Sequence, residues 1–431
     1  MMKHSLYLYN TMTCAKELFV SYYEQWKKDF VGIYSCGPTV YRDPHVWNMR
    51  AFCFADLLQK TIKYWLGLPV KHVMNLTDVG HLTDDADQGD DKMEHWAKRE
   101  NLTVRELADK YIDRFHESQK KLRIDEFDVL PRATDHIQEQ IKMISKLAKK
   151  GYTYEISGEG IYMDTAKVPD YWHMCGLSNQ QLQAWARVSH SQKKNHNDFA
   201  LRKFSSPDEK RQMERESPWW TWFPGWHIEC SAMASTYLWE FFDIHTWWVD
   251  HIGVHHPNEV AQSECCFEHK PRVQYRLHNE FLQLGWKKMA KSSWSIQTLE
   301  KVIDAWYSPL DLKFLFLSWH YRSFLDFTDN SMQQACNSRQ NLYRKIQKNI
   351  NHTQLQKKSE WHSLSLYDNM SYDEFLWKYD KSFYFIFEDI VAPLFDDLNT
   401  PALFAKINEY LKKYQNHKSL FYVIECICWL D

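Results

Sequence analysis

The chain has 431 residues, of which 44% are hydrophobic and 25% are charged, and its formal net charge is −3. This length predicts two to four domains with a substantial core, and the near-neutral charge excludes a chain that is basic overall, so nucleic acid could be bound only through local patches. No run of about 18 apolar residues and no basic-then-apolar leader occurs, which predicts a cytoplasmic protein without a membrane segment.

The first elements predict a parallel sheet. Val31–Ser35 has the composition of a buried strand, residues 48–64 that of an amphipathic helix, and residues 70–76 that of a second strand. This strand–helix–strand order is the start of an α/β fold. Thr77 and Asp78 follow the second strand, at the edge where such sheets bind ligands. Both are candidate site residues, and a turn-forming role remains the alternative.

Two short segments far apart in the chain carry a nucleotide-binding signature. Residues 36–48 read Cys-Gly-Pro-Thr-Val-Tyr-Arg-Asp-Pro-His-Val-Trp-Asn, and residues 288–292 read Lys-Met-Ala-Lys-Ser. Together they resemble the two ATP motifs of class I aminoacyl-tRNA synthetases. The resemblance implies that ATP, with Mg²⁺, is handled by Thr39, His45, Asn48, Asp250, Lys288 and Lys291, of which His45, Asn48, Lys288 and Lys291 are the catalytic set. Charge that grows on phosphate oxygens needs such positioned donors and a helix N-terminus.

A third pattern has the character of a metal site. Residues 226–233 read Trp-His-Ile-Glu-Cys-Ser-Ala-Met, and residues 255–259 read His-His-Pro-Asn-Glu. They resemble the zinc-binding segments of the cysteinyl-tRNA synthetases, which implies one Zn²⁺ per chain, held by Cys36, Cys230, His255 and Glu259, with Trp226 bordering the cysteine pocket. The i, i+4 spacing of His255 and Glu259 puts both on one helix face, and two thiolates, an imidazole and a carboxylate are a plausible zinc set.

A metal has a functional logic here. Rejecting serine, which differs from cysteine in one atom, by shape alone gains only about 1 to 3 kcal/mol. Zinc prefers a thiolate to a neutral hydroxyl. The resemblance therefore implies a ligase that activates cysteine with ATP to cysteinyl-adenylate and transfers it to the 3′ end of tRNA(Cys), and we expect a monomer. Two alternatives stay open: a cysteine ligase acting on an amino-sugar in low-molecular-weight thiol synthesis, and a non-catalytic tRNA-binding relative.

The resemblance also implies a division of the chain into five parts. Residues 1–124 and 217–300 are expected to form the two halves of a Rossmann-like catalytic domain, and the polar, less regular residues 125–216 the connective insertion between them. A helical stem-contact region at 301–350 and a helical tRNA-binding region at 351–431 follow. The family signature Asp-Asp-Leu-Asn-Thr-Pro stands at 396–401, although family members usually continue further, so we expect this last region to be shortened.

The sequence departs from the family in its glycines. The chain has 12 Gly and 20 Trp, where about 7% glycine, roughly 30 residues, is ordinary. Fourteen tryptophans stand where we expect glycine or a very small residue: 47, 96, 172, 185, 220, 222, 239, 247, 248, 286, 294, 306, 319 and 429. Reading UGA codons as Trp in a genome where they specify Gly explains this better than a diverged, aromatic-rich core, because an indole at position 47 fills space that ATP needs.

Overall fold

The computed structural model describes residues 5–79, 92–171, 192–195, 197–204, 215–216, 221–284, 287–288, 298–352 and 381–413. Its centre is a four-stranded sheet of β3 (Val31–Ser35), β4 (Val70–Met74), β10 (Phe242–Trp248) and β11 (Val273–Asn279), in the order β11-β10-β3-β4. Every pairing in it is parallel. The predicted strand–helix–strand start and the parallel α/β sheet are confirmed.

Helix α2 (Val46–Lys60) connects β3 to β4 and continues into the π-helical turn η1 (Thr61–Trp65), so the predicted helix at 48–64 is confirmed with an earlier start. The helix is buried on nearly all sides. Its buried charges therefore need partners: Lys60 Nζ lies 3.0 Å from Asp56, and Lys313 Nζ of a later helix lies 3.3 Å from the same carboxylate.

The N-terminal segment covers one edge of the sheet. Strands β1 (Tyr7–Asn10) and β2 (Ala15–Leu18) form an antiparallel hairpin, and the short helix α1 (Tyr22–Trp26) follows it. The backbone N–H of Thr11 donates to the carbonyl of Arg276 on β11 over 2.8 Å. This contact ties the hairpin to the parallel sheet.

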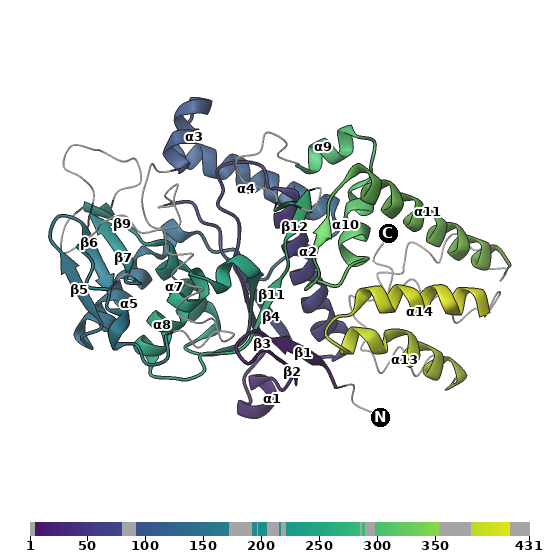
Figure 1. Ribbon diagram of the computed structural model, residues 1–431, viewed down its shortest axis with the longest axis horizontal. Coiled ribbons are helices and arrows are strands. Elements are labelled where there is room, and N and C mark those ends of the chain that lie inside the picture. Colours follow the sequence, from purple (N-terminus) through teal and green to yellow (C-terminus); the bar gives the residue numbers. More distant parts are fainter. Residues whose placement is uncertain are drawn as a thin grey trace.

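A second, antiparallel sheet lies at the left of Figure 1. It consists of β5 (Thr153–Ile156), β6 (Gly160–Met163), β7 (Phe199–Phe204), β8 (Arg215–Glu216) and β9 (Thr221–Pro224), in the order β5-β6-β7-β9-β8. The helices α5 (Ile137–Lys149), α7 (Trp226–Leu238) and α8 (His255–Phe267) lie between the two sheets and share an apolar cluster with β6 and β7. The stretch that appears irregular in sequence therefore contains regular structure.

The remaining elements complete the outline. Upstream of α5 lie α3 (Lys92–Glu100), α4 (Val104–Lys121) and the 3₁₀ turn η2 (Ala133–His136), while η3 (Thr165–Lys167) follows β6 and η5 (Val249–Ile252) follows β10. A small sheet combines β12 (Leu282–Leu284), β13 (Lys287–Lys288) and β14 (Leu325–Asp326). The last helices are α9 (Leu299–Asp304), α10 (Pro309–Leu317), α11 (Asp329–His352), α13 (Lys381–Phe395) and α14 (Thr400–Lys413). In the described residues no helix has the length and apolarity needed to span a bilayer.

Candidate metal and nucleotide site

The site is built on the segment that leaves β3 at the carboxyl edge of the parallel sheet. Cys36 follows the last residue of β3, and the backbone N–H of Gly37 donates to Asn75 Oδ1 over 2.9 Å. A Cβ at Gly37 would lie 1.6 Å from the Asn75 carbonyl oxygen. Only glycine permits this close approach, which places Cys36 beside the end of β4, at the edge where parallel sheets bind ligands.

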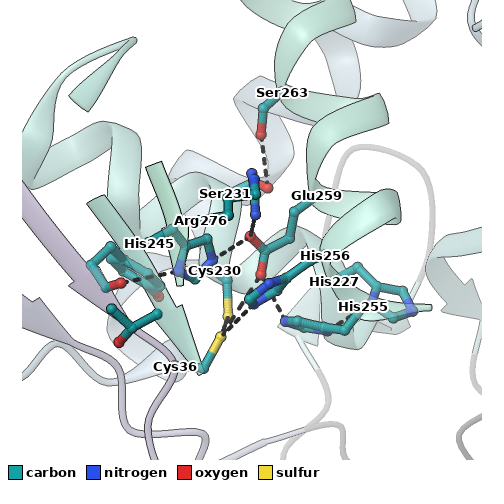
Figure 2. A network of polar contacts seen from close by, with 12 residues as sticks. Cys36, His227, Cys230, Ser231, His245, His255, His256, Glu259, Ser263 and Arg276 are labelled. Atoms are coloured by element: carbon teal, nitrogen blue, oxygen red, sulfur yellow. Dashed lines mark hydrogen bonds and ion pairs between the residues drawn. The ribbon is translucent and has the colours of Figure 1, made fainter. Parts of the chain in front are cut away.

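The four predicted metal ligands come together at this edge, as Figure 2 shows. Cys36 Sγ lies 4.0 Å from Cys230 Sγ and 3.9 Å from Glu259 Oε1, and His255 Nε2 lies 2.7 Å from the same oxygen. All four side chains are buried, and their ligand atoms lie within 4.8 Å of one another. They come from the segment directly after β3, from α7 and from α8.

The geometry of the two thiols fits zinc. Four ligands at zinc-bond lengths of about 2.0 to 2.3 Å form a tetrahedron with edges of roughly 3.3 to 3.8 Å, close to the 4.0 Å between the sulfurs. Both cysteines are free thiols. Two thiols, an imidazole and a carboxylate buried in one small volume are the donor set of a tetrahedral zinc centre.

Sequence reasoning missed the histidines that surround this cluster. His245 and His256 form a second candidate ligand group with Cys36 and Glu259. His245 is bonded on both sides, with Nδ1 2.9 Å from the Tyr34 carbonyl and Nε2 2.7 Å from Glu259 Oε2. His256 Nε2 lies 3.7 Å from Cys36 Sγ. His245 therefore fixes one carboxylate oxygen of Glu259 and leaves the other oriented toward His255 and Cys36.

Opposite charges set the ionisation of the cluster. Burial would raise the pKa of Glu259, but His245 and His255 hold it well below its usual range. Burial would lower the pKa of His255, but Glu259 and Cys230 raise it to about 9. A hydrogen bond with Cys36 lowers the pKa of the Cys230 thiol to about 7, whereas burial and Cys230 raise that of Cys36. Cys230 is thus the first thiol to become the thiolate that metals bind.

The predicted ATP motif forms the N-terminus of α2. His45 is the N-cap, its backbone N–H donates to Asn48 Oδ1 over 3.2 Å, and its Nδ1 accepts the backbone N–H of Trp47. Burial lowers the pKa of His45 to about 3, so its ring is neutral at neutral pH. The ring of Trp47 lies 4.4 Å from that of His45, and its Nε1–H donates to Asn48 Oδ1. The indole thus packs against the ring of His45 and bonds to the side chain of Asn48, the two residues that the motif supplies here.

The two candidate residues after β4, Thr77 and Asp78, have different hydrogen-bond partners. Thr77 pairs with Thr39 through a parallel bridge, and its hydroxyl donates over 3.4 Å to Oε2 of Glu229, the neighbour of Cys230 on α7. Asp78 accepts the backbone N–H and the hydroxyl of Thr134 over 2.9 and 2.6 Å. These bonds attach Asp78 to η2, and its role as a candidate site residue stays a prediction.

Of the other predicted site residues, one lies against a metal ligand and the rest lie on other elements or outside the described residues. The Trp226 ring lies 4.4 Å from the His255 ring, and Asp250 lies in η5 directly after β10. Lys288 belongs to the two-residue strand β13, and Lys291 lies outside the described residues. The structure therefore brings Trp226 to the metal ligands and leaves the Lys291 assignment a prediction.

Several suspect tryptophans have glycine-like surroundings. Trp239 has φ 70° and ψ −170°, a region populated almost only by glycine. Trp306 has φ 66° and is 96% exposed. Trp247 and Trp248 are buried at the carboxyl end of β10, where the expected glycines would leave room for a ligand.

Comparisons with known proteins agree with this geometry. A model of the catalytic domain of class I (C) tRNA synthetases matches residues 22–337. A cysteine–tRNA ligase of Treponema denticola is 39% identical over 410 residues, covering 95% of this chain and 82% of the relative. A cysteine–tRNA ligase of Burkholderia lata is 44% identical over 318 residues, covering 73% of this chain and 67% of the relative. The fold resembles that of Mycobacterium tuberculosis methionyl-tRNA synthetase in complex with methionyl-adenylate, with a TM-score of 0.58 and 13% identity. The superposition covers 93% of this chain and 89% of that one. The chain belongs to the class I (C) tRNA synthetase family.

Proposed function

We propose that the protein is a cysteine–tRNA ligase, which forms cysteinyl-adenylate from cysteine and ATP and transfers the cysteinyl group to tRNA(Cys). The observation that carries the proposal is the buried cluster of Cys36, Cys230, His255 and Glu259 at the carboxyl edge of the parallel sheet. The relatives from Treponema denticola and Burkholderia lata, both named cysteine–tRNA ligases, support it.

In this proposal the four side chains hold one Zn²⁺ per chain. When bound, zinc would supply a Lewis acid that prefers the thiolate of cysteine to the hydroxyl of serine. His245 fixes the orientation of the Glu259 carboxylate from the side away from Cys36. Trp226 packs against the His255 ring and forms a wall of the cysteine pocket.

ATP binds at the N-terminus of α2. The backbone N–H groups of the first turn and the helix dipole stabilise negative charge there. His45, Asn48, Thr39 and Asp250 position the nucleotide. Lys288 and Lys291 stabilise the charge that develops as pyrophosphate leaves. Mg²⁺ accompanies ATP, as is general for phosphoryl chemistry.

The tRNA is bound outside this centre. We assign residues 1–124 and 217–300 to the catalytic domain, 125–216 to the connective insertion, 301–350 to a stem-contact region and 351–431 to a tRNA-binding region. We further propose a monomer that works in the cytoplasm. The match to the Treponema denticola ligase extends over 95% of the chain, including the C-terminal helices, and supports tRNA as the acceptor rather than an amino-sugar.

Cysteine-dependent ATP–pyrophosphate exchange followed by tRNA charging tests the proposal. The assay compares the chain as written with one carrying Gly at positions 47, 247 and 248, since these indoles lie in the ATP motif and at the end of β10. Exchange with cysteine but not serine is expected from the glycine form. Absence of exchange from both forms contradicts ligase function, and exchange without charging of any tRNA points to the amino-sugar alternative.

A further inference from the structure

Arg50 is a buried guanidinium on the helix that carries the ATP motif. It is 2% exposed and lies two residues after Asn48 on α2. Its four hydrogen bonds all go to backbone carbonyls. Nη1 donates to the carbonyls of Glu280 and Phe281 over 2.9 and 3.0 Å, and Nη2 donates to those of His320 and Ser323 over 3.2 and 2.7 Å.

These carbonyls belong to two segments that Arg50 joins. Glu280 and Phe281 lead directly into β12, which pairs with β13, the strand of Lys288. His320 and Ser323 belong to the turn after α10, which pairs with the first segment through the Glu280 N–H and the Tyr321 carbonyl at 2.8 Å. β12, α2 and α10 appear beside one another in Figure 1.

The same turn is the docking point of the C-terminal helices. Asp397, between α13 and α14, accepts the Tyr321 hydroxyl over 2.6 Å and Arg322 Nε over 2.8 Å. The Tyr321 ring stacks on that of Phe54, one helical turn beyond Arg50, with centroids 4.4 Å apart. Contacts therefore run without interruption from Asp397, through residues 320–323, to α2.

Burying a charge is costly unless ion pairs or hydrogen bonds compensate it. Among the described residues no carboxylate lies within ion-pair distance of Arg50; its five N–H donors lie in a rigid plane. Two carbonyls on each terminal nitrogen fix both segments relative to α2. A lysine has three N–H donors on one nitrogen and could not donate to all four carbonyls.

We propose that Arg50 is a positioning residue for adenylate formation. It holds the β12–β13 hairpin, which carries Lys288, and the turn 320–323 against the ATP motif. Turnover therefore also depends on the contact of Asp397 with this turn. This inference rests on the proposed function. A misplacement of about 1 Å between reacting groups costs on the order of 10²-fold in rate, so a loosened hairpin slows the reaction without changing the cysteine pocket.

Pyrophosphate exchange by Arg50→Lys and Asp397→Asn variants tests the inference. The variants are made in the active form of the protein, either the chain as written or the chain with Gly at positions 47, 247 and 248. Arg50→Lys is expected to lower turnover at least about ten-fold with KM for cysteine unchanged within about two-fold, and Asp397→Asn to lower it about three- to ten-fold. Because both act on one turn, the double variant should be about as slow as Arg50→Lys alone. Arg339→Lys and Asp389→Asn, whose ion pairs with Asp311 and Lys406 lie elsewhere, are matched controls.

The outcomes separate this inference from the proposed function. An unsubstituted protein without exchange contradicts the function itself. With active protein, turnover of Arg50→Lys within two-fold of the unsubstituted rate, or losses that multiply in the double variant, overturns the inference, as does a variant that loses only thermal stability. If Arg50→Lys does not fold, Asp397→Asn decides: unchanged exchange turnover overturns the coupling of the C-terminal helices to the ATP site.

Discussion

The sulfur atoms of Cys36 and Cys230 lie 4.0 Å apart although 194 residues separate them in the chain. One follows β3, and the other lies on α7, which packs against α8, α5 and the parallel sheet. This contact requires the segments before and after the antiparallel sheet to fold together.

Cys230→Ser is expected to weaken zinc binding strongly, because the thiol with the lowered pKa of about 7 is replaced by a hydroxyl, a much poorer ligand. Elemental analysis of the unsubstituted protein should give one zinc per chain. Cys53→Ser, another buried free cysteine, is the control and should retain the metal. A folded, active protein without metal would refute the zinc assignment.

Lys291→Ala is expected to slow adenylate formation by about 10² to 10³-fold, the usual loss on removal of one donor that meets developing charge. Cysteine binding should change little, because the interaction forms in the transition state. Exchange kinetics with varied cysteine measure both quantities. An unchanged turnover with a raised KM for cysteine would assign Lys291 a different role.

The buried side chain of His72 is expected to make the free energy of unfolding depend on pH. It is buried between Gln59 Oε1 at 2.7 Å and Ser35 Oγ at 2.8 Å, and burial lowers its pKa from 6.5 to about 3. The folded protein thus holds it neutral, while the unfolded chain protonates it below pH 6.5. The contribution of neutral His72 to the free energy of unfolding is present above pH 6.5 and is lost as the pH falls toward 3. About 2 kcal/mol is lost by pH 5.

Urea unfolding at pH 5 and pH 7 measures this effect. His72→Asn, which keeps a donor toward Gln59, should flatten the pH dependence of the unfolding free energy by about 2 kcal/mol. His116→Asn, at an exposed position of α4, should leave it as in the unsubstituted protein. Equal pH dependence in all three proteins would show that His72 is not the titrating group.

The tryptophan excess makes a prediction about the gene. We expect UGA at codons 47, 239, 247, 248, 286, 294 and 306, and UGG at codons 219 and 226. A peptide from the native organism that spans His45 to Asn48 should have the mass of glycine at position 47. UGG at codons 47, 247 and 248, or robust exchange by the chain as written, would disprove the decoding hypothesis.

Stability offers a second test of the same hypothesis. Trp306→Gly should leave stability unchanged or raise it by up to about 1 kcal/mol, because it relieves a left-handed conformation at a fully exposed side chain. Trp65→Gly, at a buried tryptophan outside the suspect set, should cost several kcal/mol, on the order of 3 to 5. Thermal unfolding of both variants measures the contrast.

The sequence predicted local and chemical features better than the environment of the site. The strand at Val31–Ser35 is predictable because an apolar run is a local signal, whereas the four proposed ligands follow from the resemblance to a known family. His245 was not predicted, since a lone histidine in a buried strand has no local sign of the carboxylate it will meet. Asp78 shows the same limit: its partner Thr134 lies 56 residues away, so its role depends on tertiary contacts.

The antiparallel sheet separates the proposed ligands along the chain, with Cys36 before it and Cys230, His255 and Glu259 after it. During synthesis an amino-terminal fragment therefore holds a single thiol of the set. Two separately produced pieces, divided within the insertion, should each bind zinc weakly and bind it tightly once mixed. Metal uptake would then serve as a direct signal that the halves have assembled.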